Sequence, residues 1–279
     1  MNNMCHIFNL IRVYNVLLSG ITVFIAAYLL DFFLFYSTFK LSIIVMSTMT
    51  IGNIMNDLLD IESDQINHPN RVLASNRLTV RFAILIFSFS VFILVYFSLQ
   101  ISFKSLFFLY GFILPLLFSY NIYFKKFPVI GNIIVSLLLG SVFWFTELAL
   151  LDSFSILYTP FFLVIIFSFV REIIKDMEDY DGDKSVGMLT LPIIVGKEAM
   201  NYIIIFSVLT LIIVLLFPFI FWNYNLKYLL LLIILIEIPL IYSLILLVKY
   251  PSKKTYASIA SLLKILTIGG LLIIMVSKN

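Results

Sequence analysis

The amino-acid sequence predicts an all-α membrane protein, and two observations support that prediction. The chain is 62% hydrophobic and 12% charged, with a mean hydropathy of +1.13, whereas a soluble domain carries roughly 25% charged residues. Its apolar residues also gather in stretches of spanning length. These stretches cover residues 10–30, 41–56, 80–100, 104–124, 130–150, 155–174, 200–222, 226–248 and 257–276. A bilayer core of ~30 Å takes about 20 helical residues, so we expect about nine transmembrane helices.

The stretches differ in how they end. The second, 41–56, is short and runs directly into an acidic segment, and the sixth, 155–174, also ends in acidic residues. Charged side chains are costly inside the hydrocarbon region. We therefore expect the last turn of the second helix at or beyond the membrane surface.

The basic residues predict the orientation. With the N-terminus placed inside, the inner connections and helix ends hold Arg12, Arg71, Arg77, Arg81, Lys125, Lys126, Arg171, Lys175, Lys184, Lys197, Lys249, Lys253 and Lys254. The outer side holds Lys40, Lys104, Lys227 and Lys278. An excess of Lys and Arg marks cytoplasmic loops, so we expect the N-terminus and both acidic segments on the cytoplasmic side.

The composition also limits the domain organisation, the disulfides and the partners that can be expected. No low-complexity linker interrupts the chain, so we expect a single domain over residues 1–279, made of two motif-bearing halves, about 1–125 and 126–250, and a final helix. The single cysteine, Cys5, excludes an internal disulfide and a cysteine-based metal cluster. The net charge of +3 mainly reflects the inner loops and does not indicate nucleic acid as a partner. The oligomeric state cannot be read from the sequence.

Two acidic segments repeat one spacing. Residues 56–64 read N-D-L-L-D-I-E-S-D and residues 175–183 read K-D-M-E-D-Y-D-G-D, so each contains D-x-x-D-x-x-x-D. With Glu172, these first and second acidic motifs hold ten of the chain's 15 acidic residues. Carboxylates crowded at a membrane boundary repel one another and are costly to desolvate, so they need a cation.

The spacing also predicts which cation. On a continuous helix, Asn56, Asp57, Asp60 and Asp64 fall within an arc of about 100° on one face. Asp176, Asp179 and Asp183 fall within about 60°. A set of oxygen donors without His or Cys fits a hard cation, Mg²⁺ or Mn²⁺. Mg²⁺ usually takes one or two carboxylates, with phosphate oxygens completing its shell. The two motifs therefore predict metal ions that bind a polyphosphate.

Basic residues surround both motifs. These residues are Arg71 and Arg77 after the first motif, Lys125 and Lys126 in the next inner loop, and Arg171 and Lys175 around the start of the second motif. Phosphate accepts bidentate Arg contacts and point-charge Lys contacts. The alternative, that each is an ordinary positive-inside residue at a helix end, stays open for every one of them.

The first motif resembles the N-D-x-x-D-x-x-x-D signature of the UbiA superfamily of intramembrane prenyltransferases, and the second resembles that superfamily's other aspartate-rich motif. The likeness continues through residues 67–71, residues 75–77, Tyr120 with Lys125-Lys126, and residues 190–192 with Gly196. It implies a UbiA-type fold, with about nine helices around a central cavity.

The chain departs from the family pattern at three backbone positions. Val72 and Val13 stand where the family usually has proline, and Asn76 stands where glycine is expected. These departures affect turns rather than ligands.

The resemblance implies an enzyme that depends on Mg²⁺, with Mn²⁺ as an alternative. It would transfer a prenyl group from a prenyl diphosphate to a lipid-soluble acceptor among the membrane lipids and release diphosphate. Residues 171–183 look most like the branch that prenylates geranylgeranylglyceryl phosphate, with geranylgeranyl diphosphate as donor. An aromatic quinone precursor stays open as the alternative acceptor.

The resemblance also implies roles for particular residues. The metal ligands would come from Asn56, Asp57, Asp60, Asp64, Asp176, Asp179 and Asp183. The diphosphate would be bound by Arg71, Arg77, Lys125 and Lys175, and the acceptor by Asn15, Tyr120 and Arg171. The residues expected to be catalytic are Asp60, Asp64, Asp179, Asp183 and Lys125.

A cation-coupled transporter is the alternative from a different functional class. Repeated acidic motifs in two halves could bind a coupling ion, but transporter sites lie near the midplane at broken helices. Here the acidic motifs are expected at one surface beside basic residues. That arrangement favours a diphosphate.

Overall fold

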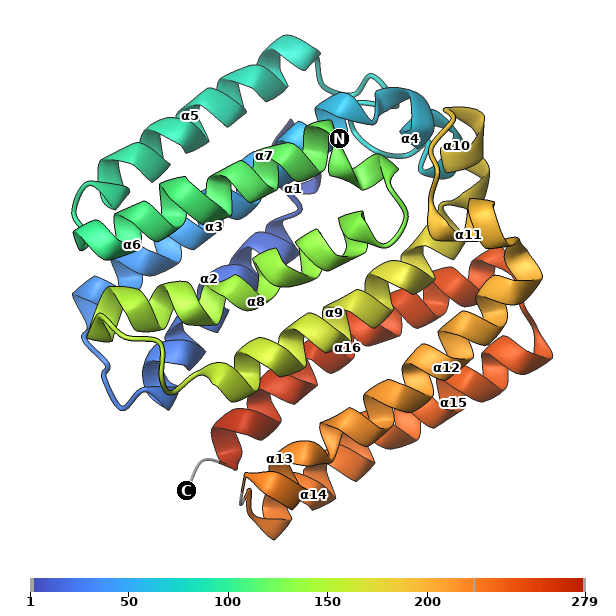
Figure 1. Ribbon diagram of the computed structural model, residues 1–279. Coiled ribbons are helices and arrows are strands. Elements are labelled where there is room, and N and C mark those ends of the chain that lie inside the picture. The colour runs from blue at the N-terminus through green and yellow to red at the C-terminus, as the bar shows by residue number, and fades with distance from the viewer. Residues whose placement is uncertain (1–2, 223, 278–279) are drawn as a thin grey trace. The chain divides into compact units, whose positions relative to one another are not determined.

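The computed structural model describes residues 3–222 and 224–277, and this part of the chain is helical without β-strands (Figure 1). Lys278, expected on the outer side, lies outside the described residues. The chain divides into two compact units. The first contains residues 1–125, 141–157 and 181–188, and the second contains residues 126–140, 158–180 and 189–279. The expectation of a single domain stays a prediction.

The first unit is built around α3, which packs against α2, α5 and α7. Its helices are α1 (Asn3–Ile11), α2 (Val13–Leu29), α3 (Phe35–Leu59), α4 (Ile61–Asn67), α5 (Val80–Ser98), α6 (Phe103–Phe108), the π-helix η1 (Leu109–Ile113) and α7 (Leu114–Ile122). The later part of α8 (Ile130–Leu151) and most of α10 (Tyr180–Ser185) also belong to it. The short 3₁₀ turn η2 (Phe124–Lys126) lies at its boundary.

The expectation that the second helix is short is wrong. α3 begins at Phe35 and runs for 25 residues to Leu59. Its first turns combine exposed aromatic residues with polar ones such as Thr38 and Lys40, so the apolar stretch in the sequence begins later than the helix does.

The N-terminal helices α1 and α2 meet at a bend of 56°. Arg12 lies at the bend with a φ of 55°, in the left-handed region. The amide nitrogen Nδ2 of Asn53 donates a 2.9 Å hydrogen bond to the carbonyl oxygen of Ile11, so the end of α1 is held by α3. This hydrogen bond satisfies a backbone acceptor that the helix end would leave unpaired.

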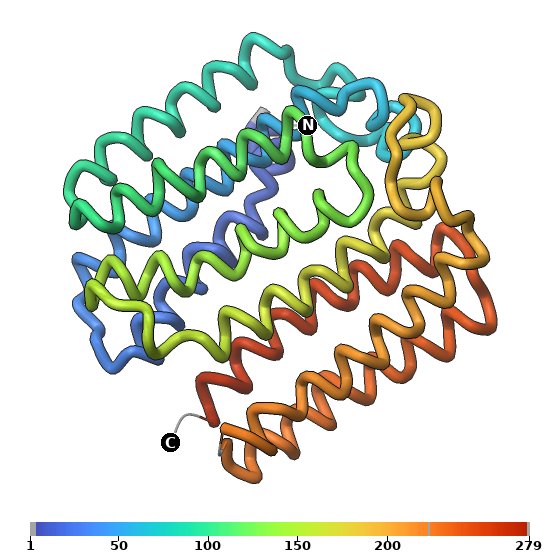
Figure 2. Tube along the Cα trace, in the orientation of Figure 1, coloured from blue at the N-terminus to red at the C-terminus, as the bar shows by residue number. Residues whose placement is uncertain are grey.

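In the second unit, α9 packs against α16 and α12 (Figure 2). Its helices are the first part of α8, α9 (Tyr158–Glu178), α11 (Leu191–Val195), α12 (Lys197–Leu215), α13 (Phe217–Phe221), α14 (Leu226–Leu232), the π-helix η3 (Ile233–Glu237), α15 (Ile238–Lys249) and α16 (Lys253–Val276).

Both units contain a π-helix just before a proline. The π-helix η1 comes two residues before Pro115, and the π-helix η3 comes two residues before Pro239. Proline has no N–H and its ring clashes with the carbonyl four residues earlier. A wider turn just before the proline relieves that clash, which lets each segment continue as one long helix.

Seven helices of the described residues are long and apolar enough to cross a membrane, or eight if the bent pair α1 and α2 counts as one span. Each of the nine expected stretches contains a helix. However, α9 is not among the seven helices that could span a membrane, because charged residues occupy its last turns. Many helix faces expose large apolar side chains, as lipid-facing surfaces do. The chain is a multi-pass membrane protein, and the count of nine spans is not confirmed.

Candidate functional site

Both acidic motifs cross a break between two helices, and in each the break falls at the middle aspartate. Asp60 separates α3 from α4, with φ −104° and ψ 11°, and Asp179 separates α9 from α10. The expectation of one continuous helical face is therefore wrong for both motifs. Aspartate side chains compete with the backbone for hydrogen bonds, and like charges on neighbouring turns repel one another.

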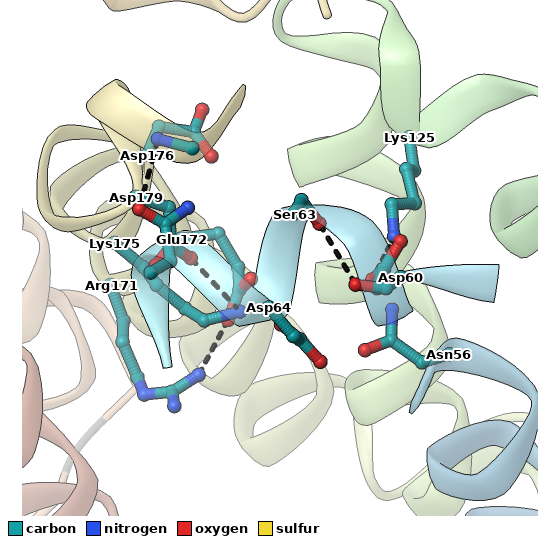
Figure 3. A network of polar contacts seen from close by, with 12 residues as sticks. Asn56, Asp60, Ser63, Asp64, Lys125, Arg171, Glu172, Lys175, Asp176 and Asp179 are labelled. Atoms are coloured by element: carbon teal, nitrogen blue, oxygen red, sulfur yellow. Dashed lines mark hydrogen bonds and ion pairs between the residues drawn. The ribbon is translucent and has the colours of Figure 1, made fainter. Parts of the chain in front are cut away.

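Asp60 is held by the next inner loop. The ammonium group of Lys125 forms an ion pair with the carboxylate of Asp60, and both side chains are about nine-tenths buried. The hydroxyl of Ser63 donates a 3.2 Å hydrogen bond to the backbone carbonyl of Asp60. Figure 3 shows these side chains with Asn56 beside them. Since a buried charge without its partner is strongly destabilising, each side chain fixes the other.

Two arginines share the buried carboxylate of Asp57, which is 3% exposed. Arg12 Nη2 lies 2.5 Å from Asp57 Oδ1 and also donates to Asn56 Oδ1 at 3.2 Å. Arg71 Nη1 lies 3.8 Å from Asp57 Oδ1 and 2.5 Å from Asp64 Oδ1. The bend between α1 and α2 therefore brings Arg12 onto the first acidic motif.

The pKa of Asp64 is raised above its ordinary value, chiefly because burial disfavours the charged carboxylate. The neighbouring carboxylates of Asp57 and Asp60 raise it further, and Arg71 lowers it without cancelling the other causes. Asp64 therefore lies where an additional cation would be stabilising.

Part of the second acidic motif lies in the same unit as the first. The backbone N–H of Gly182 donates a 3.0 Å hydrogen bond to Oδ1 of Asn67, at the end of α4. Asp183 follows directly and is buried. A Cβ atom on Gly182 would come within 2.3 Å of Asn67 Nδ2, so the contact requires glycine. The structure thus brings Asp183 into the unit that holds Asn56, Asp60 and Asp64.

The other acidic residues of the second motif lie in the second unit. Asn132 Nδ2, near the start of α8, donates a 2.9 Å hydrogen bond to Asp176 Oδ2. Arg171 Nη1 lies 2.5 Å from Glu172 Oε1, and Lys175 Nζ lies 3.9 Å from Asp179 Oδ2 (Figure 3). Arg171, expected to bind the acceptor, is thus paired with the residue that follows it.

The sequence interpretation missed Asn132 and gave no role to Asn67. Asn67 belongs to a segment that carries the family resemblance, which was a usable signal, whereas nothing in the spacing marks Asn132. Arg77 is exposed, and no ion pair joins it to an acidic residue in the described part of the chain. Asn15 and Tyr120 are half-buried in α2 and α7, so their roles stay predictions.

Residues 15–268 match the model of the UbiA prenyltransferase family. The chain belongs to this family. It is therefore a prenyltransferase, as the family resemblance implied, and the UbiA resemblance stated from the two acidic motifs is confirmed.

Curated relatives within the UbiA family are similar over most of the chain. The digeranylgeranylglyceryl phosphate synthase of Methanocaldococcus jannaschii is 33% identical over 223 residues, 80% of this chain and 77% of that protein. The protein of the same name from Sulfolobus acidocaldarius is 32% identical over 271 residues, 95% of this chain and 94% of that protein.

Solved UbiA structures share the fold. A structure of digeranylgeranylglyceryl phosphate synthase in membranes is 30% identical, with a TM-score of 0.72 over 100% of this chain and 99% of that one. A UbiA homologue from Archaeoglobus fulgidus, bound to GPP and Mg²⁺, is 16% identical, with a TM-score of 0.66 over 96% of this chain and 99% of that one. The expected UbiA-type, all-helical fold is confirmed.

Proposed function

We propose that this UbiA family member transfers a geranylgeranyl group from geranylgeranyl diphosphate to geranylgeranylglyceryl phosphate. The observation that carries this proposal is the similarity to digeranylgeranylglyceryl phosphate synthases at about 32% identity over up to 95% of the chain. The segment around the second acidic motif is the part of the sequence that looks most like that branch. The product is a glycerol phosphate with two prenyl ethers.

The donor set of the first unit fits Mg²⁺. Asn56, Asp60, Asp64 and Asp183 offer amide and carboxylate oxygens, which suit a hard cation. The raised pKa of Asp64 is consistent with this assignment, because burial disfavours its charged carboxylate and a bound cation would stabilise that charge. When bound, Mg²⁺ supplies positive charge that stabilises the leaving diphosphate. Asp176 and Asp179 remain predicted ligands.

Lys125 and Arg71 are the basic residues best positioned to bind the diphosphate. Each is paired with a carboxylate of the first motif, Lys125 with Asp60 and Arg71 with Asp64. Their N–H donors can bind phosphate oxygens once those carboxylates are neutralised by bound metal ions. Asp57 differs from its neighbours, since its carboxylate orients two arginines.

The reaction breaks the bond between C1 of the prenyl donor and the diphosphate oxygen, and diphosphate leaves with the electron pair. The free hydroxyl oxygen of the acceptor bonds to C1, and its proton passes to the leaving diphosphate. Basic residues around the first motif stabilise the negative charge that grows on the diphosphate. The apolar helices keep water away from the allylic cation, which water would otherwise capture.

We further propose nine spanning helices around a central cavity, with α9 as the ninth span and the acidic motifs on the cytoplasmic side. The concentration of basic residues on the side of the motifs supports this orientation. The charged last turns of α9 then extend beyond the hydrocarbon region.

A transfer assay tests the proposed function. The protein in detergent with Mg²⁺ and geranylgeranyl diphosphate should yield product with geranylgeranylglyceryl phosphate and none with 4-hydroxybenzoate. Product only with the aromatic acid would overturn the acceptor. Asp60→Asn should abolish turnover, and Asp152→Asn, which alters an exposed carboxylate paired with Lys104, is the matched control. Full activity of Asp60→Asn would overturn the metal assignment.

A further inference from the structure

A polar cavity of about 460 Å³ lies in the first unit, beside the first acidic motif. Its polar lining consists of Asn9, Arg12, Asn67, His68, Asn70 and Arg71, with Asp57 in its wall. The volume falls within the roughly 300–1,000 Å³ that is usual for small-molecule sites. The roles given above assign Arg71 to the diphosphate and leave Arg12 and the asparagines of this lining without a ligand.

The charges of the lining favour an anion. Two guanidinium groups face one carboxylate, because Arg12 and Arg71 share Asp57. Both side-chain contacts of Arg12 use its Nη2 atom, whereas a guanidinium carries five N–H donors. The three asparagine amides of the lining add further donors. A negatively charged group with several acceptor oxygens is the ligand that this lining matches.

The walls of the cavity contact both acidic motifs. Arg71 reaches Asp64 of the first motif at 2.5 Å. Asn67 accepts a hydrogen bond from the backbone N–H of Gly182 in the second. An anion held in the cavity therefore lies next to the residues proposed to bind the diphosphate.

We propose that this cavity binds the phosphate monoester of the acceptor lipid, an assignment that rests on the proposed function. A phosphate monoester has three terminal oxygens and about two negative charges. These match the Arg12 guanidinium and the neighbouring asparagine amides, with Arg71 shared between this phosphate and the diphosphate. A carboxylate needs only one bidentate arginine, so an aromatic acid would engage fewer of the hydrogen-bond donors in the lining than a phosphate monoester. The donor diphosphate needs metal ligands, and the one carboxylate of the lining is already paired with two arginines.

Two-substrate kinetics test the assignment. Arg12→Gln should raise the KM for geranylgeranylglyceryl phosphate by roughly tenfold or more, as expected when a charge-assisted hydrogen bond is lost. The KM for geranylgeranyl diphosphate should stay within about twofold. Arg81→Gln, an exposed arginine in the first turn of α5, is the matched control and should change neither constant.

A second measurement keeps the test decisive if Arg12→Gln fails to fold. Glycerol 1-phosphate should inhibit the wild-type enzyme competitively against geranylgeranylglyceryl phosphate and not against geranylgeranyl diphosphate. Competition with the donor, or a changed donor KM in Arg12→Gln, would overturn the assignment while the proposed function stands. A wild-type enzyme that makes no product with the glycerol phosphate would overturn the proposed function, and the assignment with it.

Discussion

The backbone N–H of Gly182 donates a hydrogen bond to the side chain of Asn67, so the second acidic motif is tied to the end of the first. We expect Gly182→Ala to lower transfer activity, because a methyl group would lie 2.3 Å from Asn67 Nδ2 and displace the Asn67 amide that accepts the hydrogen bond. Steady-state kinetics in detergent measure the effect. Gly270→Ala is the control, since a Cβ there meets no atom within 4 Å. Equal activity of Gly182→Ala and wild type would show that this contact is dispensable.

Lys125 competes with metal for Asp60, because the two side chains form a buried ion pair. In Lys125→Met we expect Mn²⁺ alone to bind more tightly than in the wild type, while prenyl transfer falls by roughly 100-fold through the loss of a charge on the diphosphate. Calorimetric titration with Mn²⁺ and a transfer assay give the two results. Lys126→Met, which removes the neighbouring charge, is the matched comparison. Weaker Mn²⁺ binding in Lys125→Met would contradict this competition.

The raised pKa of Asp64 predicts a pH dependence of metal binding. Below its pKa the carboxyl is protonated and must release a proton to bind Mg²⁺, so affinity should fall as pH decreases through that value. Because the pKa is raised, the fall should begin at a higher pH than an ordinary aspartate would give. The raised pKa of Asp64 affects the stability of the metal-free protein in the opposite direction. The stabilisation that it contributes is fully present at low pH and is lost as pH rises through the raised pKa.

The Mg²⁺ concentration for half-maximal activity, measured across a pH series, tests this pH dependence. A constant Mg²⁺ requirement down to the range of an unperturbed aspartate would disprove it.

Glu147 anchors the loop between α8 and α9. Its side chain is completely buried, and its carboxylate accepts hydrogen bonds from the backbone N–H groups of Ser155, Ile156 and Leu157 at 2.5–2.9 Å. Glu147→Ala should lower the free energy of unfolding by at least about 1–3 kcal/mol, since buried donors lose their acceptor. Thermal unfolding in detergent measures this, with Glu198→Ala on exposed α12 surface as control. An unchanged unfolding midpoint would contradict the anchoring role.

The sequence predicted the helical membrane class, a helix within each of the nine apolar stretches and the two acidic motifs, because hydropathy and spacing report these directly. It could not show that both motifs break at their middle aspartate, since the break at Asp60 interrupts a pattern that still has helical spacing. Nor could it show that Arg12 meets Asp57, 45 residues away, because a bend in left-handed backbone makes that contact. Asn76 adopts a φ of 56° at a position where the family resemblance expected glycine, so the substitution preserves the turn.

The π-helix η1 determines which way the end of its span faces. A π-turn holds one residue more than an α-turn, and each residue of an α-helix turns the chain by about 100°. Everything after Ile113, including Tyr120 and the approach to Lys125, is therefore rotated by that angle relative to an uninterrupted helix. Deleting the single residue Gly111 would restore an ordinary helical phase and turn Tyr120 onto a different face. A one-residue insertion in the middle of the membrane thus sets the angular position of the helix that leads to Lys125, whose ammonium group pairs with Asp60.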